Sequence, residues 1–241
     1  MDHADQAAGP VPEPPDRPEP KVIITGTGRA GTTLLVQVLT DLGLDTGYTS
    51  EAEGDPLTKG GLEKDITRPD APRIVKSPYL SWQLGELVDS GTVTIDHVIV
   101  PIRDLDVAAA SRVRSTKYGT NLRTRGGLFG TAKATKQRDV LARFEYELFF
   151  TIARLDLPHT LLHFPRLAED WEYTYRKLSF LAPAIEPDRW KAVIEGRYQP
   201  TWVHEQPLST SERALAVAGT VYHRGITRPI RGVRRVLGRS K

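Results

Sequence analysis

Short runs of apolar and β-branched residues alternate along the chain with longer stretches in which apolar residues recur at helical spacing. The short runs predict strands at residues 22–24, 73–76, 97–102 and 160–164. Helical spacing predicts helices over residues 34–42, 82–88, 107–112 and 140–155, and a later helix that ends at residue 181. The run at 97–102 is continuously apolar after His97, which is typical of a parallel sheet buried on both faces. The pattern therefore predicts an α/β domain.

A glycine-bearing loop lies between the first predicted strand and the first predicted helix. Gly26, Gly28 and Gly31 permit tight turns that expose successive backbone N–H groups, and the helix that opens at Thr32 directs its unpaired N–H groups to the same point. Arg29 adds a permanent charge, and the two threonines add hydroxyl donors. The predicted anion-binding residues are Thr27, Gly28, Arg29, Ala30, Gly31, Thr32 and Thr33. Such a loop is expected to bind a phosphate or a sulfate.

The loop differs from that of ordinary nucleoside triphosphatases. In the frame GxxxxGK[ST], which here runs from Gly26 to Thr33, Thr32 stands where the lysine belongs. The order Arg-Ala-Gly-Thr-Thr-Leu-Leu resembles the 5′-phosphosulfate loop of sulfotransferases that use 3′-phosphoadenosine 5′-phosphosulfate (PAPS). In that family a basic residue, a small residue and Gly-Thr-Thr follow one another.

Two further strand ends carry candidate residues. Lys76 closes the second predicted strand, and Lys-Ser-Pro at this place resembles an element of several sulfotransferase branches in which the lysine faces the reacting centre. Arg103 follows the third strand, and Ser111 lies eight residues later within a predicted helix. This spacing resembles the 3′-phosphate motif of the same family. Ligands of parallel α/β sheets bind at this edge, so we expect the motifs to meet.

The resemblance covers residues 21–181 and implies a P-loop-like, three-layer α/β/α sandwich with a central parallel sheet. It also implies PAPS as the sulfuryl donor, 3′-phosphoadenosine 5′-phosphate (PAP) as the product, and metal-free in-line transfer to an acceptor hydroxyl or amine. Arg29 and Lys76 would stabilise the charge that develops on the bridging oxygen. Arg103 and Ser111 would anchor the 3′-phosphate.

The base and the acceptor depend on the loop after the first helix. Glu51 resembles in position the glutamate base of related sulfotransferase branches, and Glu53 is the next choice. The acids of this loop are Glu51, Glu53, Asp55, Glu63 and Asp65. Tyr48, Tyr79, Trp82 and Phe129 could line an acceptor pocket or pack in the core. The basic, glycine-rich residues 115–137 are expected near the cofactor or the acceptor. We expect a small-molecule, glycan or lipid acceptor and no nucleic-acid partner.

The ends of the chain differ in charge, although the net charge is only +3. Residues 1–20 hold five acidic residues and six prolines, which predicts a disordered leader. The predicted domain is therefore 21–221, and residues 222–241 hold seven basic and no acidic residues. This tail is either a solvated segment or one attracted to an anionic partner, a membrane surface or the phosphates of the cofactor.

Composition removes several classes of function. The chain has no cysteine, which excludes a thiolate nucleophile and a cysteine-ligated metal and fits a reducing compartment. It has no apolar run long enough for a membrane span and no basic, apolar signal at its start, so a cytoplasmic location is expected. Its six histidines are scattered, and no metal site is predicted.

Two other functions fit parts of the sequence. A small-molecule kinase with an atypical P-loop would require Mg²⁺, with Asp104 as the acid at a strand end. A non-catalytic P-loop module would bind anionic partners through the basic tail in a salt-sensitive way. Such a module needs neither the loop motif nor the Arg103–Ser111 pair.

Overall fold

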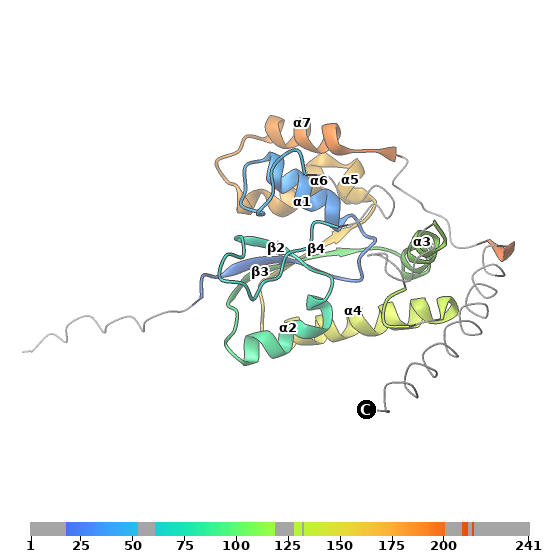
Figure 1. Ribbon diagram of the computed structural model, residues 1–241. Coiled ribbons are helices and arrows are strands. Elements are labelled where there is room, and N and C mark those ends of the chain that lie inside the picture. The colour runs from blue at the N-terminus through green and yellow to red at the C-terminus, as the bar shows by residue number, and fades with distance from the viewer. Residues whose placement is uncertain are drawn as a thin grey trace, which may run out of the picture.

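The computed structural model describes residues 18–52, 61–118, 128–131, 133–200, 209–211 and 214 (Figure 1). Residues 1–17, and with them most of the acidic leader, lie outside the described residues. The basic tail 222–241 also lies outside them. Within the described part, no helix has the length and apolar character needed to cross a membrane.

Four parallel strands form the centre of the molecule. They are β1 (Lys21–Ile24), β2 (Ile74–Lys76), β3 (Ile95–Ile102) and β4 (His159–His163), in the order β2-β1-β3-β4. All four correspond to strands predicted from the apolar runs, although β3 begins two residues earlier than expected and β4 spans 159–163 rather than 160–164. Because the strands are parallel, their carboxyl ends lie along one edge of the sheet.

Helices cover both faces of this sheet (Figure 1). On one face lie α1 (Thr32–Asp41), α5 (Arg166–Glu169), α6 (Trp171–Leu178) and α7 (Pro187–Arg197); on the other lie α2 (Leu80–Asp89) and α4 (Gln137–Arg154). Side chains alternate between the two cores along each strand, since Val22 and Ile24 join the α1 side and Ile23 joins the α2 side. The three-layer α/β/α sandwich with a central parallel sheet is confirmed.

The remaining elements extend these layers. Helix α3 (Leu105–Tyr118) follows β3 directly and lies beyond the carboxyl ends of the strands (Figure 1). It packs against α4 through Ala108, Ala109 and Leu141. Two 3-10 turns, η1 (Ala134–Lys136) and η2 (Ser179–Leu181), precede α4 and follow α6. The position of α3 places its side chains beside the loop that leaves β1.

Helix α7 was not among the predicted helices, the last of which ends at residue 181. Pro187 starts the helix, and Trp190, Val193 and Ile194 recur at helical spacing and are buried against α1 and α6. Arg197 pairs with Asp41 at the end of α1, with Nε 2.5 Å from a carboxylate oxygen. The chain from 187 to 197 is therefore part of the core layer.

Replacement of Trp190 by alanine is expected to lower the free energy of unfolding by about 3–5 kcal/mol, because the fully buried ring would leave a cavity. Denaturation in urea, followed by far-ultraviolet circular dichroism, measures this loss. Lys191→Ala, on the exposed side of the same helix, is the matched control and should change stability little. Equal effects of the two substitutions would contradict the packing of α7.

Candidate anion-binding site

The loop between β1 and α1 curls through a series of left-handed residues. Gly28, Arg29 and Gly31 have φ of 69°, 61° and 80°, and Gly26 has φ of 137°. Successive N–H groups in such a conformation form a concave anion-binding backbone. Gly31 also precedes the first turn of α1, which has no acidic side chain to offset the positive end of the helix. The backbone conformation is therefore of the kind that binds anions, as the sequence predicts.

The glycines of this loop are packed tightly against neighbouring elements. A Cβ at Gly31 would lie 2.7 Å from Cδ2 of Phe164, the residue that follows β4. A Cβ at Gly28 would lie 2.6 Å from Nη2 of Arg112 on α3. Side chains from α3 and from the end of β4 thus hold the loop, so its curl is imposed from both sides.

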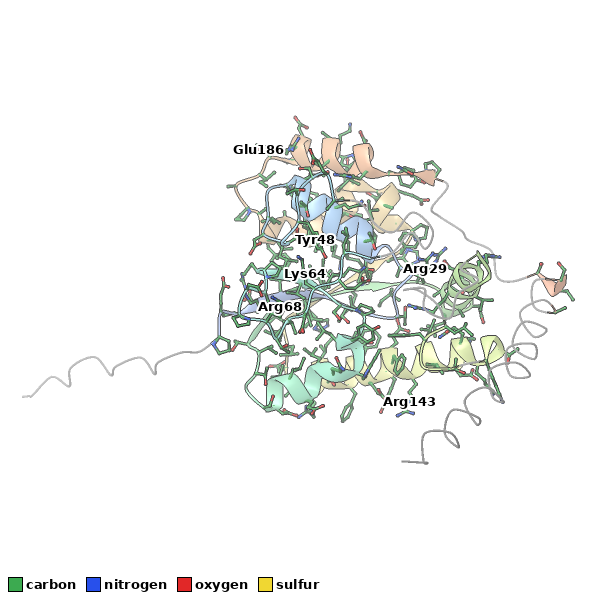
Figure 2. All side chains as sticks on the ribbon, in the orientation of Figure 1. Arg29, Tyr48, Lys64, Arg68, Arg143 and Glu186 are labelled. Atoms are coloured by element: carbon green, nitrogen blue, oxygen red, sulfur yellow. The ribbon has the colours of Figure 1, made fainter. Side chains whose placement is uncertain are left out.

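The two predicted phosphate motifs meet in the structure. Arg29 Nε donates a hydrogen bond to Ser111 Oγ at 3.1 Å, and Arg103 Nη1 donates to the Arg29 carbonyl at 3.0 Å. Arg103 is buried and lies over the ring of Phe164, with Cζ 4.8 Å from the ring centroid. Residues 29, 103 and 111, from the β1–α1 loop, the end of β3 and helix α3, therefore form one cluster. Figure 2 shows Arg29 on the side of the molecule where α3 lies.

The hydroxyl and small residues of the loop lie where the sequence predicts. Thr27, Ala30 and Thr32 are buried. The Thr27 hydroxyl donates to the Gly28 carbonyl at 3.3 Å, so it braces the loop. Thr33 is half-buried and accepts a hydrogen bond from Lys76. The roles of these residues toward a ligand stay predictions.

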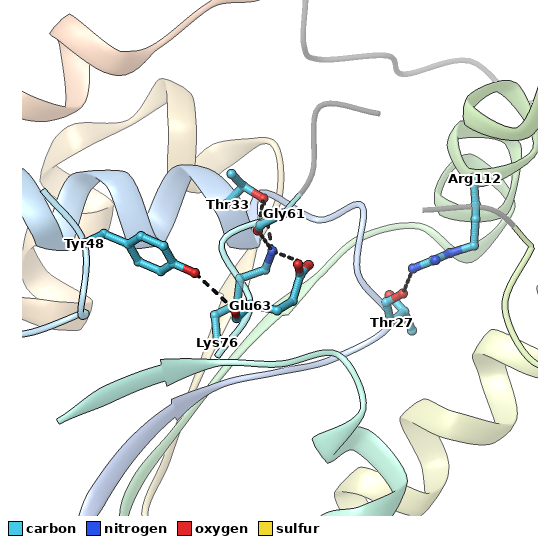
Figure 3. A network of polar contacts seen from close by, with 7 residues as sticks. All are labelled: Thr27, Thr33, Tyr48, Gly61, Glu63, Lys76 and Arg112. Carbon is cyan, nitrogen blue, oxygen red and sulfur yellow. Dashed lines mark hydrogen bonds and ion pairs between the residues drawn. The ribbon is translucent and has the colours of Figure 1, made fainter. Parts of the chain in front are cut away.

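Arg112 is a member of the site that sequence reasoning missed. Its Nη2 donates to the Thr27 carbonyl at 2.7 Å (Figure 3). Its guanidinium lies over the ring of Phe129, with Cζ 4.8 Å from the centroid. Burial, followed by the neighbouring charge of Arg29, lowers the pKa of Arg112 to about 10. The sequence feature that could have indicated Arg112 is its position directly after Ser111, a predicted phosphate-binding residue.

Phe129 is held in place by a side chain at the start of α4. The buried Gln137 side chain accepts a hydrogen bond from the Phe129 N–H at 2.6 Å and donates one to the Phe129 carbonyl at 3.1 Å. Tyr79, Trp82 and Phe144 surround the Phe129 ring, with centroids 4.8 to 5.7 Å away. Of the aromatic candidates for an acceptor pocket, Tyr79, Trp82 and Phe129 therefore form one cluster. Tyr48 lies apart from them, against Lys64 (Figure 2).

Lys76 joins the site from the end of β2. Its ammonium donates to Thr33 Oγ1 at 3.2 Å, to a Glu63 carboxylate oxygen at 2.9 Å and to the Gly61 carbonyl (Figure 3). Burial lowers the pKa of Lys76, and the Glu63 carboxylate offsets part of this effect. Strand β2 thus brings an ammonium group to the start of α1, at the hydroxyl of Thr33.

The carboxylate at this lysine is Glu63 rather than the predicted base. Glu51 is exposed in a turn, and the carbonyl of its neighbour Ser50 accepts a hydrogen bond from Arg197 of α7 at 2.6 Å. Glu53 lies outside the described residues, as do residues 119–127 of the basic segment. The assignment of Glu51 as the base stays a prediction.

Four cations therefore meet at the carboxyl ends of the strands: Arg29, Lys76, Arg103 and Arg112. The charge of Arg29 lowers the pKa of both Lys76 and Arg112, so the cations repel one another. A bound dianion would relieve this repulsion. Among the described residues, no cluster of histidine and carboxylate groups could hold a metal ion.

Comparison with known proteins yields one structural similarity. Searches of protein-family models and of curated proteins find no match. Among solved structures, the chain is similar to a sulfotransferase domain from the curacin biosynthetic pathway, with 12% sequence identity, a TM-score of 0.44 and coverage of 84% of each chain. A similarity this low does not assign an activity.

Replacement of Gly31 by alanine is expected to destabilise the protein more than replacement of Gly43. The two glycines have nearly equal φ, 80° and 83°, but a Cβ at Gly43 meets nothing within 4 Å, whereas one at Gly31 meets Phe164. Both variants should lose about 1–2 kcal/mol from the left-handed backbone, and Gly31→Ala a further ~1–3 kcal/mol from overpacking. Urea denaturation of the two variants tests this, and equal losses would contradict the packing of the loop.

Proposed function

We propose that the protein is a PAPS-dependent sulfotransferase, which moves a sulfuryl group to a hydroxyl or amine of a small-molecule, glycan or lipid acceptor. The observation that supports this most is the contact of Arg29 with both Ser111 and Arg103. It joins the loop suited to a 5′-phosphosulfate and the pair suited to a 3′-phosphate into one site. A ligand with two phosphate positions, as in PAPS, matches this arrangement.

The residues of the site have distinct roles in this proposal. PAPS supplies the sulfuryl group, and its transfer leaves negative charge on the oxygen that bridged sulfur and phosphorus. Arg29, the N–H groups of the loop and Lys76 are the donors that stabilise this charge. Arg103 and Ser111 bind the 3′-phosphate and orient the nucleotide. Glu51 remains the proposed proton acceptor.

The site offers less to the kinase alternative. The Asp104 carboxylate is exposed and accepts a hydrogen bond from the Val107 N–H at 2.9 Å, so it caps the first turn of α3. The Thr33 hydroxyl, which corresponds to the metal-binding hydroxyl of a nucleoside triphosphatase loop, contacts the Lys76 ammonium instead. The Asp104 carboxylate and the Thr33 hydroxyl, which would hold Mg²⁺ in a kinase, thus both contact other groups of the protein.

Isothermal titration with PAP in EDTA, with ATP–Mg²⁺ in parallel, tests the proposal. We expect PAP to bind without a divalent metal, and Arg103→Ala to weaken binding about 10- to 100-fold through loss of a charge-assisted contact. Arg138→Ala is the matched control, because Arg138 is exposed on α4 and pairs with Asp106.

The other outcomes distinguish the alternatives. Binding of ATP–Mg²⁺ alone would favour the kinase. Binding of neither nucleotide, combined with salt-sensitive binding of anionic polymers, would favour the non-catalytic module.

The affinity for PAP should also fall at alkaline pH. Burial lowers the pKa of Lys76, so its proton, and with it a positive charge of the site, is lost before the pH reaches the ordinary lysine value of 10.5. Titrations at increasing pH measure the decline. Lys76→Met lacks the titrating group and should bind PAP more weakly at neutral pH, with a smaller alkaline decline. An equal decline in both proteins would exclude Lys76 as its source.

A further inference from the structure

The three hydrogen-bond donors of the Lys76 ammonium all have acceptors. A protonated lysine has three N–H groups, and the structure shows three acceptors around it: Thr33 Oγ1, the Gly61 carbonyl and the Glu63 carboxylate (Figure 3). The Lys76 side chain is 4% exposed, so little water is available as an alternative partner. A new acceptor can therefore bind this ammonium only by displacing one of the three.

The three acceptors differ in how easily they can leave. Thr33 belongs to the first turn of α1, whose position is set by the core. Gly61 contributes a backbone carbonyl, which cannot move without its chain. The Glu63 side chain is 32% exposed and can rotate toward solvent. An incoming anion also repels the Glu63 carboxylate but not the neutral hydroxyl and carbonyl. Glu63 is thus the partner that an anion displaces.

The backbone around Glu63 holds its carboxylate on the lysine. Lys64 N–H donates to the Lys76 carbonyl at 3.1 Å, and the Tyr48 hydroxyl donates to the Glu63 carbonyl at 3.1 Å. Leu62, directly before Glu63, has φ of 61°, a left-handed conformation that a leucine adopts only when its surroundings impose it. These contacts fix the backbone of residues 62–64 beside Lys76, so the Glu63 side chain is the part that can move.

We propose that Glu63 is a positioning residue that holds the Lys76 ammonium at the phosphate loop and yields it to the sulfuryl group of the bound donor. This inference rests on the proposed function. Before the sulfuryl donor binds, the ion pair keeps the ammonium charged and next to Thr33. When PAPS binds, a sulfuryl oxygen replaces the Glu63 carboxylate as the acceptor. PAP has no sulfuryl group and leaves the pair intact.

The proposal predicts that Glu63 weakens binding of PAPS more than binding of PAP. Glu63→Gln keeps the shape and a neutral acceptor but removes the competing charge. The ratio of PAPS affinity to PAP affinity should therefore be about tenfold higher in this variant than in the unchanged protein. Isothermal titration of the full chain with each nucleotide in EDTA gives this ratio. Glu195→Gln, which removes an exposed carboxylate on α7, is the matched control and should leave the ratio unchanged.

A double-mutant cycle separates this role from a general effect on the fold. In a Lys76→Met background, Glu63→Gln should no longer alter the ratio of PAPS to PAP affinity, because the ammonium for which the carboxylate competes is gone. Glu63→Asp retains the charge with a shorter reach and should give a smaller gain in the same direction. It provides the same test if Glu63→Gln does not fold.

The outcomes that would overturn the inference are distinct from failure of the proposed function. Equal gains for PAPS and PAP would show that Glu63 acts only through its charge. A gain that persists in the Lys76→Met background would show that it does not act through the lysine. If the unchanged protein binds neither nucleotide, the proposed function is wrong, and the role of Glu63 is wrong with it.

Discussion

The site depends on cations that are buried at one sheet edge and that donate to backbone carbonyls of neighbouring segments. Arg103 donates to the Arg29 carbonyl, Arg112 to the Thr27 carbonyl and Lys76 to the Gly61 carbonyl. A carbonyl accepts from a donor without adding a formal charge, so these contacts fix where the three cations lie. The parallel strands make this arrangement possible because they bring residues distant in sequence to the same edge.

The local sequence was sufficient to predict the strands and the loop, because each depends on neighbouring residues. The runs at 22–24 and 97–102 are short and mostly apolar, as is typical of strands in a buried parallel sheet, and the loop glycines need no distant partner to indicate a turn. The meeting of Arg29, Arg103 and Ser111 was also predictable, since parallel strand ends converge. The three-layer arrangement followed from the family resemblance and was confirmed.

The missed features are those that depend on contacts between distant segments. Arg112 is one residue from a predicted site residue, but its importance comes from Thr27, which lies 85 positions away in the chain. Glu63 was one of five acids in the loop, and its ion pair with Lys76, a residue 13 positions later in the chain, became visible only in the structure. Helix α7 was missed although Trp190, Val193 and Ile194 have helical spacing, because only its packing against α1 and α6 shows that these residues are buried.

Gln137 connects the far layer of the sandwich to the anion site. Its side chain fixes Phe129, Phe129 supports the Arg112 guanidinium, and Arg112 holds the Thr27 carbonyl. On the opposite layer, the Phe164 ring packs against Gly31 and leaves no room for a side chain there. The loop is therefore clamped by both halves of the core. The conformation of this loop therefore depends on packing in both layers. Partial unfolding of either layer is expected to disorder the loop before the whole chain unfolds.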